Sequence, residues 1–497
     1  MRDLRCGQAF WGCVYRVAQG VLVLTGAMIG GLVGVTVAPA AVSVPMWVSG
    51  SELDVAQFAV AMDPSGDRSA LAYAGTVPRS RVGRVMLFAQ LGHGRRFWRS
   101  QRLDTLRRDR GVRAPVLLSA VKVSVAGDGS AVAVWVIMAT RRSGHSRYRV
   151  RVARAPAGLR FGRPRTLLST RRHVELTGLV AGRDGLAVVA LRRDERVQVV
   201  VARPGAARRA PQDLGSSTVY VAPPSLALVR GGGVLAAWSP TSASAARAAL
   251  LAPRGRRFRA ARAVSAAGEV ARYAVAVAGP GGAGVAWTRW PSVPGEPQQS
   301  YPWPVAGRVR FARLNAPAGH FSAPVTLADV TISGAGQVAL PRGGVATTWR
   351  QYIEKTVSGD SDFLINSQLF AHAPFTANAA ARALSQLPAI AFRPVIGALG
   401  DRALIAWREV AVRTIGSRLR LAVVGPHGWA PTITFANARR DIIQATPEIG
   451  IAEDEYPAAG DLTIAAGASS ALLAWTTLAR QADGDRLHRV RVASYRP

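Results

Sequence analysis

Small apolar residues recur along the chain in one repeated pattern. An apolar strand leads to a Gly-rich turn, and a run of alanine, valine or leucine then ends, in all but one copy, in an aromatic residue, as in GDGSAVAVW at Trp135. The other copies end at Tyr73, Leu191, Trp238, Trp287, Trp349, Trp407 and Trp475. Successive copies are 47 to 68 residues apart, which is enough for four strands each. The pattern therefore predicts eight repeated units of antiparallel hairpins.

Each unit carries a second hairpin. Its first strand alternates arginine with apolar residues, as in RYRVRVARA from Arg147, and a period of two predicts one packed and one solvated face. A Gly/Pro turn follows, and an aromatic residue then opens a fourth strand whose next apolar anchor is six residues on, as from Phe97 to Leu103. Glycine in these turns supplies the positive φ that tight hairpins require.

Four-stranded antiparallel units arranged in a ring form a β-propeller, which leaves only short sheet edges unpaired. The sequence thus predicts an all-β fold with a single β-propeller of eight four-stranded blades, or seven if the weak third repeat is not a blade. The eighth repeat stops at Pro497 after its third strand, and the segment from Trp47 to Leu53 has the spacing of a fourth strand. We therefore expect residues 45–54, a strand near the N-terminus, to complete the last blade and close the ring.

The N-terminal segment is typical of an exported protein. Arg2, Arg5 and Arg16 precede an apolar stretch over residues 17–37, and Ala-Pro-Ala at 38–40 is typical of a cleavage site. We expect a signal peptide over residues 1–40 and a propeller domain over residues 41–497, secreted or held in the cell envelope. An uncleaved membrane anchor is the alternative. Both cysteines lie in the removed segment, so the exported protein is expected to contain no thiol.

The chain is strongly basic. Lysine and arginine number 63 against 29 acidic residues, which gives a formal net charge of +34, and the only lysines are Lys122 and Lys355. An anionic partner is one interpretation of this arginine excess, and the codon composition of a GC-rich genome is the other. Non-specific binding to polyanions is expected in either case, without specific nucleic-acid recognition. Contact with a membrane is expected only if the N-terminal segment is uncleaved.

Turn lengths distinguish the two faces of the predicted ring. Links within hairpins are short, whereas links from second to third strand and between blades are long, so a site is expected on the long-loop face. The strand-ending tryptophans are expected to pack between blades. The short turns contain His93, His320, His372 and His427. His145, His173 and His488 are whole blades apart, and no histidine has metal-binding spacing, so we expect no metal site and no cofactor.

Three long loops carry the candidate ligand-binding residues. The loop of the fifth repeat has aromatic side chains between prolines, which suit stacking on sugar rings or on a Pro-rich peptide; the other two loops cluster carboxylates, which suit a cation or acid/base chemistry. Packing of the aromatic loop onto itself and ion pairs with neighbouring arginines are the structural alternatives. The candidates are Trp290, Tyr301 and Trp303, then Tyr352, Glu354, Asp360 and Asp362, then Glu453, Asp454, Glu455 and Tyr456.

The repeated glycine-to-tryptophan strands resemble those of uncharacterised secreted β-propeller repeat proteins of high-GC Gram-positive bacteria, which are loosely sialidase-like. This resemblance covers nearly all of residues 41–497 and implies a fold and an exported location, without an activity. The sequence lacks the S-x-D-x-G-x-x-W box and the Arg-Ile-Pro motif of sialidases. It also lacks the Trp-Asp endings of WD repeats and the docking motif of eight-bladed quinoprotein dehydrogenases.

Two functions remain open on this sequence. The main expectation is a non-catalytic binding or scaffold protein of the cell envelope or extracellular space, with a glycan or protein as ligand. The alternative is a glycan-cleaving hydrolase or lyase that uses carboxylates on the long-loop face. No residue is assigned a catalytic role at this point.

Overall fold

The chain divides into residues 1–39 and residues 40–497. The computed structural model describes parts of the second unit only: residues 41–50, 53–77, 85–94, 96–106, 117–140, 145–205, 210–218, 223–241, 244–290, 305–315, 319–332, 337–358, 362–373, 381–385, 389–411, 417–438, 462–480 and 486–497. These residues form an all-β propeller of eight four-stranded antiparallel blades. Within the same ranges no helix has the length and hydropathy to cross a membrane.

Each blade runs from an inner first strand to an outer fourth strand. The first strands are β3 (Asp54–Met62), β8 (Leu117–Val125), β12 (Glu175–Ala181), β16 (Ser225–Leu228), β20 (Val270–Gly279), β25 (Gln337–Ala339), β29 (Ala389–Leu399) and β34 (Leu462–Ala466). The second strands are β4 (Arg68–Thr76), β9 (Ala131–Thr140), β13 (Ala187–Arg193), β17 (Val234–Trp238), β21 (Gly282–Trp290), β26 (Ala346–Ser358), β30 (Arg402–Ala411) and β35 (Ala471–Arg480).

The third strands are β5 (Val85–His93), β10 (Ser146–Ala155), β14 (Arg196–Ala202), β18 (Arg247–Leu251), β22 (Val305–Asn315), β27 (Asp362–His372), β31 (Ser417–Gly425) and β36 (Arg486–Arg496). The fourth strands of blades one to seven are β7 (Gln101–Leu106), β11 (Arg165–Thr170), β15 (Gln212–Ser216), β19 (Arg262–Ala263), β24 (Val325–Ile332), β28 (Arg382–Ala383) and β33 (Ile433–Ala438). Short strands β6 (Arg96–Phe97), β23 (His320–Phe321) and β32 (Gly428–Trp429) pair with the third strands of blades one, five and seven, and a 3₁₀ turn spans Arg183–Gly185.

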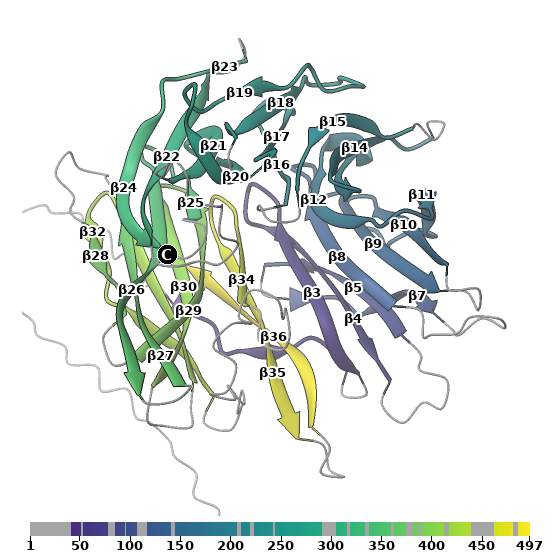
Figure 1. Ribbon diagram of the computed structural model, residues 1–497. Helices are drawn as coiled ribbons and strands as arrows, with labels where there is room; N and C mark the ends of the chain where they lie inside the picture. Colours follow the sequence, from purple (N-terminus) through teal and green to yellow (C-terminus); the bar gives the residue numbers. More distant parts are fainter. Residues whose placement is uncertain are drawn as a thin grey trace, which may run out of the picture. The chain divides into compact units, whose positions relative to one another are not determined.

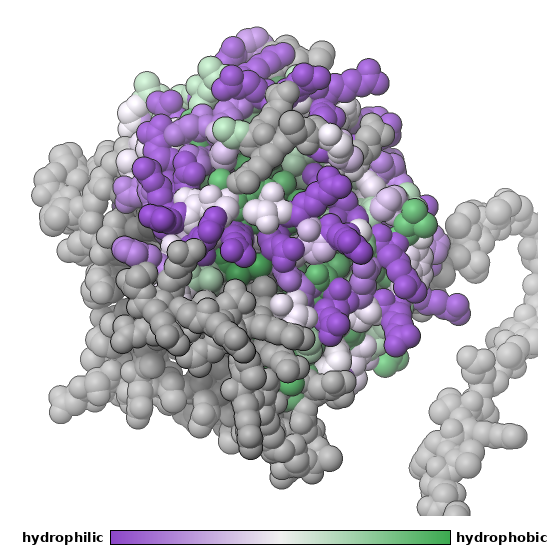
Figure 2. Space-filling model, turned by 90° about the vertical axis from the view of Figure 1, so that its right-hand side faces the viewer, coloured by the Kyte–Doolittle hydropathy of each residue, from purple (hydrophilic) through white to green (hydrophobic). Residues whose placement is uncertain are grey.

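The eight first strands follow one another around the middle of the propeller. Each contacts the first strand of the next blade, and β34 of the last blade contacts β3 of the first, so the ring is closed (Figure 1). Side chains on the outer strands are mostly polar, as Figure 2 shows for the side of the molecule that carries β7, β10 and β11. The predicted eight-bladed, single-propeller fold is therefore confirmed.

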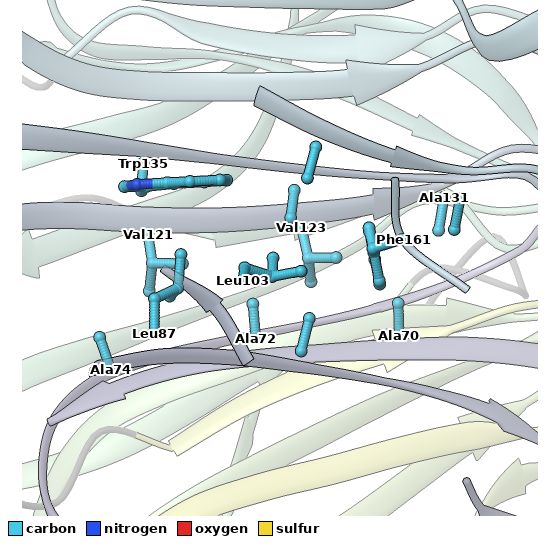
Figure 3. Close-up of a cluster of buried hydrophobic side chains, with 14 of the residues drawn as sticks. Ala70, Ala72, Ala74, Leu87, Leu103, Val121, Val123, Ala131, Trp135 and Phe161 are labelled. Atoms are coloured by element: carbon cyan, nitrogen blue, oxygen red, sulfur yellow. The ribbon is translucent and has the colours of Figure 1, made fainter. Parts of the chain in front are cut away.

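The core consists of layers between neighbouring blades. The eight side chains that end the repeated pattern, from Tyr73 to Trp475, are at most 3% exposed. Figure 3 shows one such layer, in which Trp135 and Val121 of blade two lie against Leu87 and Ala74 of blade one. A large side chain at the same position in each blade, an aromatic ring in all but blade three, fills the space that the splayed strands leave between them. The predicted packing role of the strand-ending tryptophans is confirmed.

The N-terminal segment completes the last blade, as expected. Both β1 (Ala41–Val42) and β2 (Met46–Trp47) pair antiparallel with β36, with Val42 opposite Tyr495 and Trp47 opposite Arg491. The Val48 N–H also donates a hydrogen bond to the Val490 carbonyl at 3.1 Å.

The register of this strand differs from the one expected. Val48 occupies the place that Leu103 has in blade one, and both side chains are 8% exposed, whereas Trp47 is 40% exposed. The anchors six residues apart are thus Val42 and Val48, and the expected pair Trp47 and Leu53 is wrong by five residues. The ring of Trp47 is accommodated outside the core because two guanidinium groups, of Arg489 and Arg491, lie 4.4 and 4.5 Å from its centroid.

Several first strands begin with a β-bulge. Irregular pairing occurs between Val55 and Gln57 in β3 and between Leu176 and Gly178 in β12, and β8, β20 and β29 have similar breaks near their starts. Because first strands start on the long-loop face, these bulges all lie toward that face. A bulge turns the neighbouring side chains away from the regular alternation of a strand, and such features are frequent beside functional sites.

Candidate functional site

The aromatic candidate that the structure describes is packed into its own blade. Trp290 ends β21, is 8% exposed, and has the Arg272 guanidinium 4.1 Å from its ring centroid. Burial lowers the pKa of Arg272, which accords with its position against the ring. The other two aromatic candidates, Tyr301 and Trp303, lie outside the described residues, so the binding role of this loop stays a prediction.

The acidic candidates of the sixth repeat lie on a long hairpin. Tyr352 and Glu354 belong to β26, on either side of a bulge, and Asp362 begins β27, opposite Ser358. The expectation that they share an irregular loop is therefore wrong, because the two strands continue pairing well beyond Trp349. Asp360 lies outside the described residues, as do Glu453, Asp454, Glu455 and Tyr456.

Most described carboxylates are held by arginine. In blade two, Asp104 Oδ2 accepts a hydrogen bond from Trp135 Nε1 at 3.0 Å and lies 2.5 Å from Arg151 Nη1. Glu269 has the same kind of partners in blade five, and so does Glu409 in blade seven. These carboxylates neutralise an arginine and satisfy an indole N–H beside the core. These contacts stabilise the fold. They are of the kind named above as the structural alternative for the acidic loops, namely ion pairs with neighbouring arginines.

Asp54 has a different partner. Its Oδ1 lies 2.9 Å from His488 Nδ1 and also accepts a 2.9 Å hydrogen bond from the His488 backbone N–H. Among the ion pairs of the described residues, this is the one whose cationic partner is a histidine. Asp54 begins the first strand of blade one and His488 lies near the start of β36, so the pair joins the two ends of the ring on the long-loop face.

Local structure fixes the direction of the Asp54 carboxylate. Ala56 is the unpaired residue of the bulge that follows Asp54 in β3. Across the hairpin stands Gly75, where an added Cβ would lie 2.3 Å from the Asp54 carbonyl oxygen. Glycine at this position therefore lets the two strands approach closely where the bulge turns β3 toward β36.

The pair defines the protonation pattern of the imidazole. The hydrogen bond from the His488 side chain, which is the largest contribution, and the attraction of its charge lower the pKa of Asp54 below the ordinary 3.8, so the carboxylate is ionised. An ionised carboxylate only accepts hydrogen bonds, so Nδ1 carries the hydrogen of this contact, and Nε2 is the ring nitrogen that remains for another partner. The side chains are 31% and 40% exposed for His488 and Asp54, so the pair is accessible to solvent.

The lowered pKa of Asp54 predicts a pH-dependent contribution to stability. A carboxylate with a depressed pKa in the folded state stabilises the protein above its ordinary pKa of 3.8 and loses this effect as the pH falls through the folded-state value. We expect Asp54→Asn to lower stability at pH 7 by less than about 1 kcal/mol, because the pair is partly exposed. The difference from the wild type should shrink below pH 4 in thermal melts. A constant difference from pH 7 to pH 3 would contradict this assignment.

The sequence gives little indication of this pair. The two residues are 434 positions apart, and His488 lies whole blades from His145 and His173, so no spacing in the sequence singles it out. The sequence does give one indication. If residues 45–54 complete the last blade, Asp54 must lie close to the third strand of that blade, β36. Among the described residues, no group of three histidine, cysteine or acidic side chains is arranged to hold a metal ion.

No protein-family model matches the sequence, and no curated protein matches it. Similar solved structures include Kuenenia stuttgartiensis hydrazine synthase, with 13% identity over 64% of this chain and 80% of that chain and a TM-score of 0.36. The polysaccharide lyase Uly1 has 8% identity over 73% and 88%, with a TM-score of 0.38. The Hadza microbial sialidase Hz136 has 10% identity over 59% and 63%, with a TM-score of 0.34.

The similar structures include several glycan-cleaving enzymes, among them sialidases, arabinofuranosidases, a xylosidase and a polysaccharide lyase. This finding contradicts the main expectation of a non-catalytic binding or scaffold protein and agrees better with the alternative of a glycan-cleaving enzyme. At these identities the likeness concerns the fold alone. It includes sialidase-type and other β-propellers, as the resemblance of the repeats implied.

Proposed function

We propose that the protein is an exported glycan-cleaving enzyme that acts on an acidic polysaccharide, with His488 as its general base. The observation that carries this proposal is the Asp54–His488 pair, because a histidine whose Nδ1 is held by a carboxylate presents Nε2 for proton transfer. Asp54 is then a positioning residue that holds the imidazole and stabilises its protonated form.

Charge supports an anionic substrate. The formal net charge of +34 attracts polyanions to the protein and raises their local concentration. A glycan substrate outside the cytoplasm also accords with the signal peptide expected over residues 1–40. The acidic sugars of such polymers are commonly uronates, in which a carboxylate makes the neighbouring C5–H removable by a base.

Elimination suits this site better than hydrolysis. Hydrolysis of a glycosidic bond uses two carboxyl groups on either side of it, and the described partner of Asp54 is an imidazole instead. In the elimination, His488 Nε2 takes the C5 proton, and the C5–H electron pair forms the C4=C5 double bond. The C4–O4 bond breaks, and the imidazolium returns the proton to the glycosidic oxygen, which becomes the hydroxyl of a new reducing end.

The proposal is tested by product analysis. The full chain is incubated with uronate-containing polymers such as polygalacturonate, alginate, hyaluronan and chondroitin, and with neutral xylan and arabinan. We expect new reducing ends together with ultraviolet absorbance from the conjugated double bond, on a uronate polymer only. Reducing ends without that absorbance would replace elimination by hydrolysis. No cleavage of any polymer in the panel would overturn the proposed function.

A further inference from the structure

The centre of the ring contains a cavity of about 350 Å³, separate from the Asp54–His488 pair. The first strands of blades one to four and of blade eight line it, and Figure 1 shows these strands around the middle of the propeller. Its lining includes apolar side chains such as Phe58, Val60 and Leu226, but most of the surface that faces the cavity is polar. Such a volume lies within the range of roughly 300–1,000 Å³ that is usual for small-molecule sites.

Two polar residues of the cavity lining have a side chain without a partner among the described residues. Lys122 is one of the two lysines of the chain, and no carboxylate among the described residues forms an ion pair with its ammonium. The nearest candidate, Glu175, is bound to Arg192 at 2.5 Å. Thr177 Oγ1 is buried and has no hydrogen-bond partner among the described residues. Thr177 is the bulged residue of β12, and it lines the cavity together with residues of β8.

An unpaired cation in such surroundings is costly. Burial lowers the pKa of Lys122, and the more distant Glu175 only partly opposes this effect. An anion in the cavity would supply the opposite charge that the described residues do not place beside the Lys122 ammonium. The Thr177 hydroxyl could donate a hydrogen bond to the same anion. The mainly polar wall of the cavity suits the hydroxyl groups of a small sugar acid.

We propose that the central cavity is a binding site for a small carboxylate of monosaccharide size, held by the Lys122 ammonium and the Thr177 hydroxyl. Lys122 supplies the charge and Thr177 the directional hydrogen bond. The other lining residues of the inner strands surround the rest of the ligand. The site is independent of the cleavage proposed above, because the Asp54–His488 pair is not part of the cavity lining.

The experiment is a calorimetric titration of the full chain with glucuronate, glucose and inorganic phosphate. We expect glucuronate to bind at least tenfold more tightly than glucose or phosphate. Lys122→Met, which keeps the length of the side chain without its charge, should weaken glucuronate at least tenfold. Thr177→Val, which removes only the hydroxyl, should weaken it three- to tenfold. The matched control is Lys355→Met, which removes the other lysine and should leave the affinity unchanged.

A melting curve of each variant distinguishes binding from structure. If Lys122 serves a ligand, Lys122→Met should melt at the wild-type temperature or above it, because an unpaired cation is removed. A lower melting temperature for Lys122→Met would make the ammonium a structural partner of Glu175 and overturn the proposal. Unchanged glucuronate affinity in Lys122→Met, or phosphate binding as tight as glucuronate, would overturn it as well. The titrations and melting curves measure ligand affinity and stability, so their outcome does not depend on whether any polysaccharide is cleaved.

Discussion

Deletion of residues 41–49 is expected to lower the melting temperature of the propeller by roughly 5–15 °C and to promote aggregation. The deletion removes the pairing of β1 and β2 with β36, the hydrogen bond between Ser43 N and Ser494 O at 2.8 Å, and the buried side chain of Val48. These losses amount to about 5 kcal/mol or more, at about 1 kcal/mol for each net hydrogen bond and 1.5–3 kcal/mol for a buried valine. They also leave the outer edge of β36 unpaired.

Two valines of the same segment provide a matched comparison. Val48 is 8% exposed and Val44 is 85% exposed, so only Val48 is buried between the blades. Val48→Ser should lower the free energy of unfolding by about 2 kcal/mol, whereas Val44→Ser should change it by less than about 0.5 kcal/mol. Thermal or denaturant unfolding of the full chain measures the change in the free energy of unfolding for each variant. Similar destabilisation by both substitutions, or by neither, would contradict the register of the closing strand.

Substitution of His488 by glutamine is expected to lower kcat for polysaccharide cleavage by about 10²- to 10⁴-fold. Glutamine can still donate a hydrogen bond to Asp54, which should preserve the local structure, but it has no basic nitrogen. The melting temperature should therefore change little. Asp54→Asn should also lower kcat, since an asparagine side chain can hold the imidazole in the wrong tautomer and does not stabilise its protonated form. Initial rates on the polymer that the wild type cleaves provide the measurement.

The control for this prediction is His145→Gln. His145 is exposed, precedes β10 on the long-loop face of blade two, and has no carboxylate partner among the described residues. Its substitution should leave kcat within about twofold of the wild type. Equal losses in His145→Gln and His488→Gln would point to a general effect of charge on substrate binding. Full activity in His488→Gln would remove the proposed base.

The repeated parts of the fold could be predicted because the same physical requirement acts in every blade. A large side chain at the same position of each second strand must fill the space between neighbouring blades, so aromatic residues such as Trp135 and Trp407 occupy it in all blades but the third. Turn glycines mark the hairpins for a similar reason: Gly129, with φ of +80°, occupies a conformation that side chains disfavour. These signals are local in the sequence and are repeated often enough to be recognised.

Features that occur once were harder to predict. Trp47 looked like an anchor because aromatic residues open the fourth strands of other blades, yet the outer strand of the last blade leaves its ring against Arg489 and Arg491. The Asp54–His488 pair depends on how closing the ring aligns two distant segments. Lys122 interrupts an apolar strand in the sequence, but only the ring of first strands shows that it faces a cavity.

The closing strand also determines the order in which this protein can fold. Ser43 and Ser494, which bond to each other, are 451 residues apart, so their contact must form after almost the whole chain has been synthesised. Among the described residues, the strands of blades one to seven pair within their own blade, apart from one contact between blades five and six, where Ile332 lies opposite Gln351. These blades can therefore assemble in succession behind the emerging chain. Until β36 is complete, residues 41–49 remain without their partner. The last blade is thus the part of the propeller that is completed last, because its fourth strand comes from the opposite end of the chain.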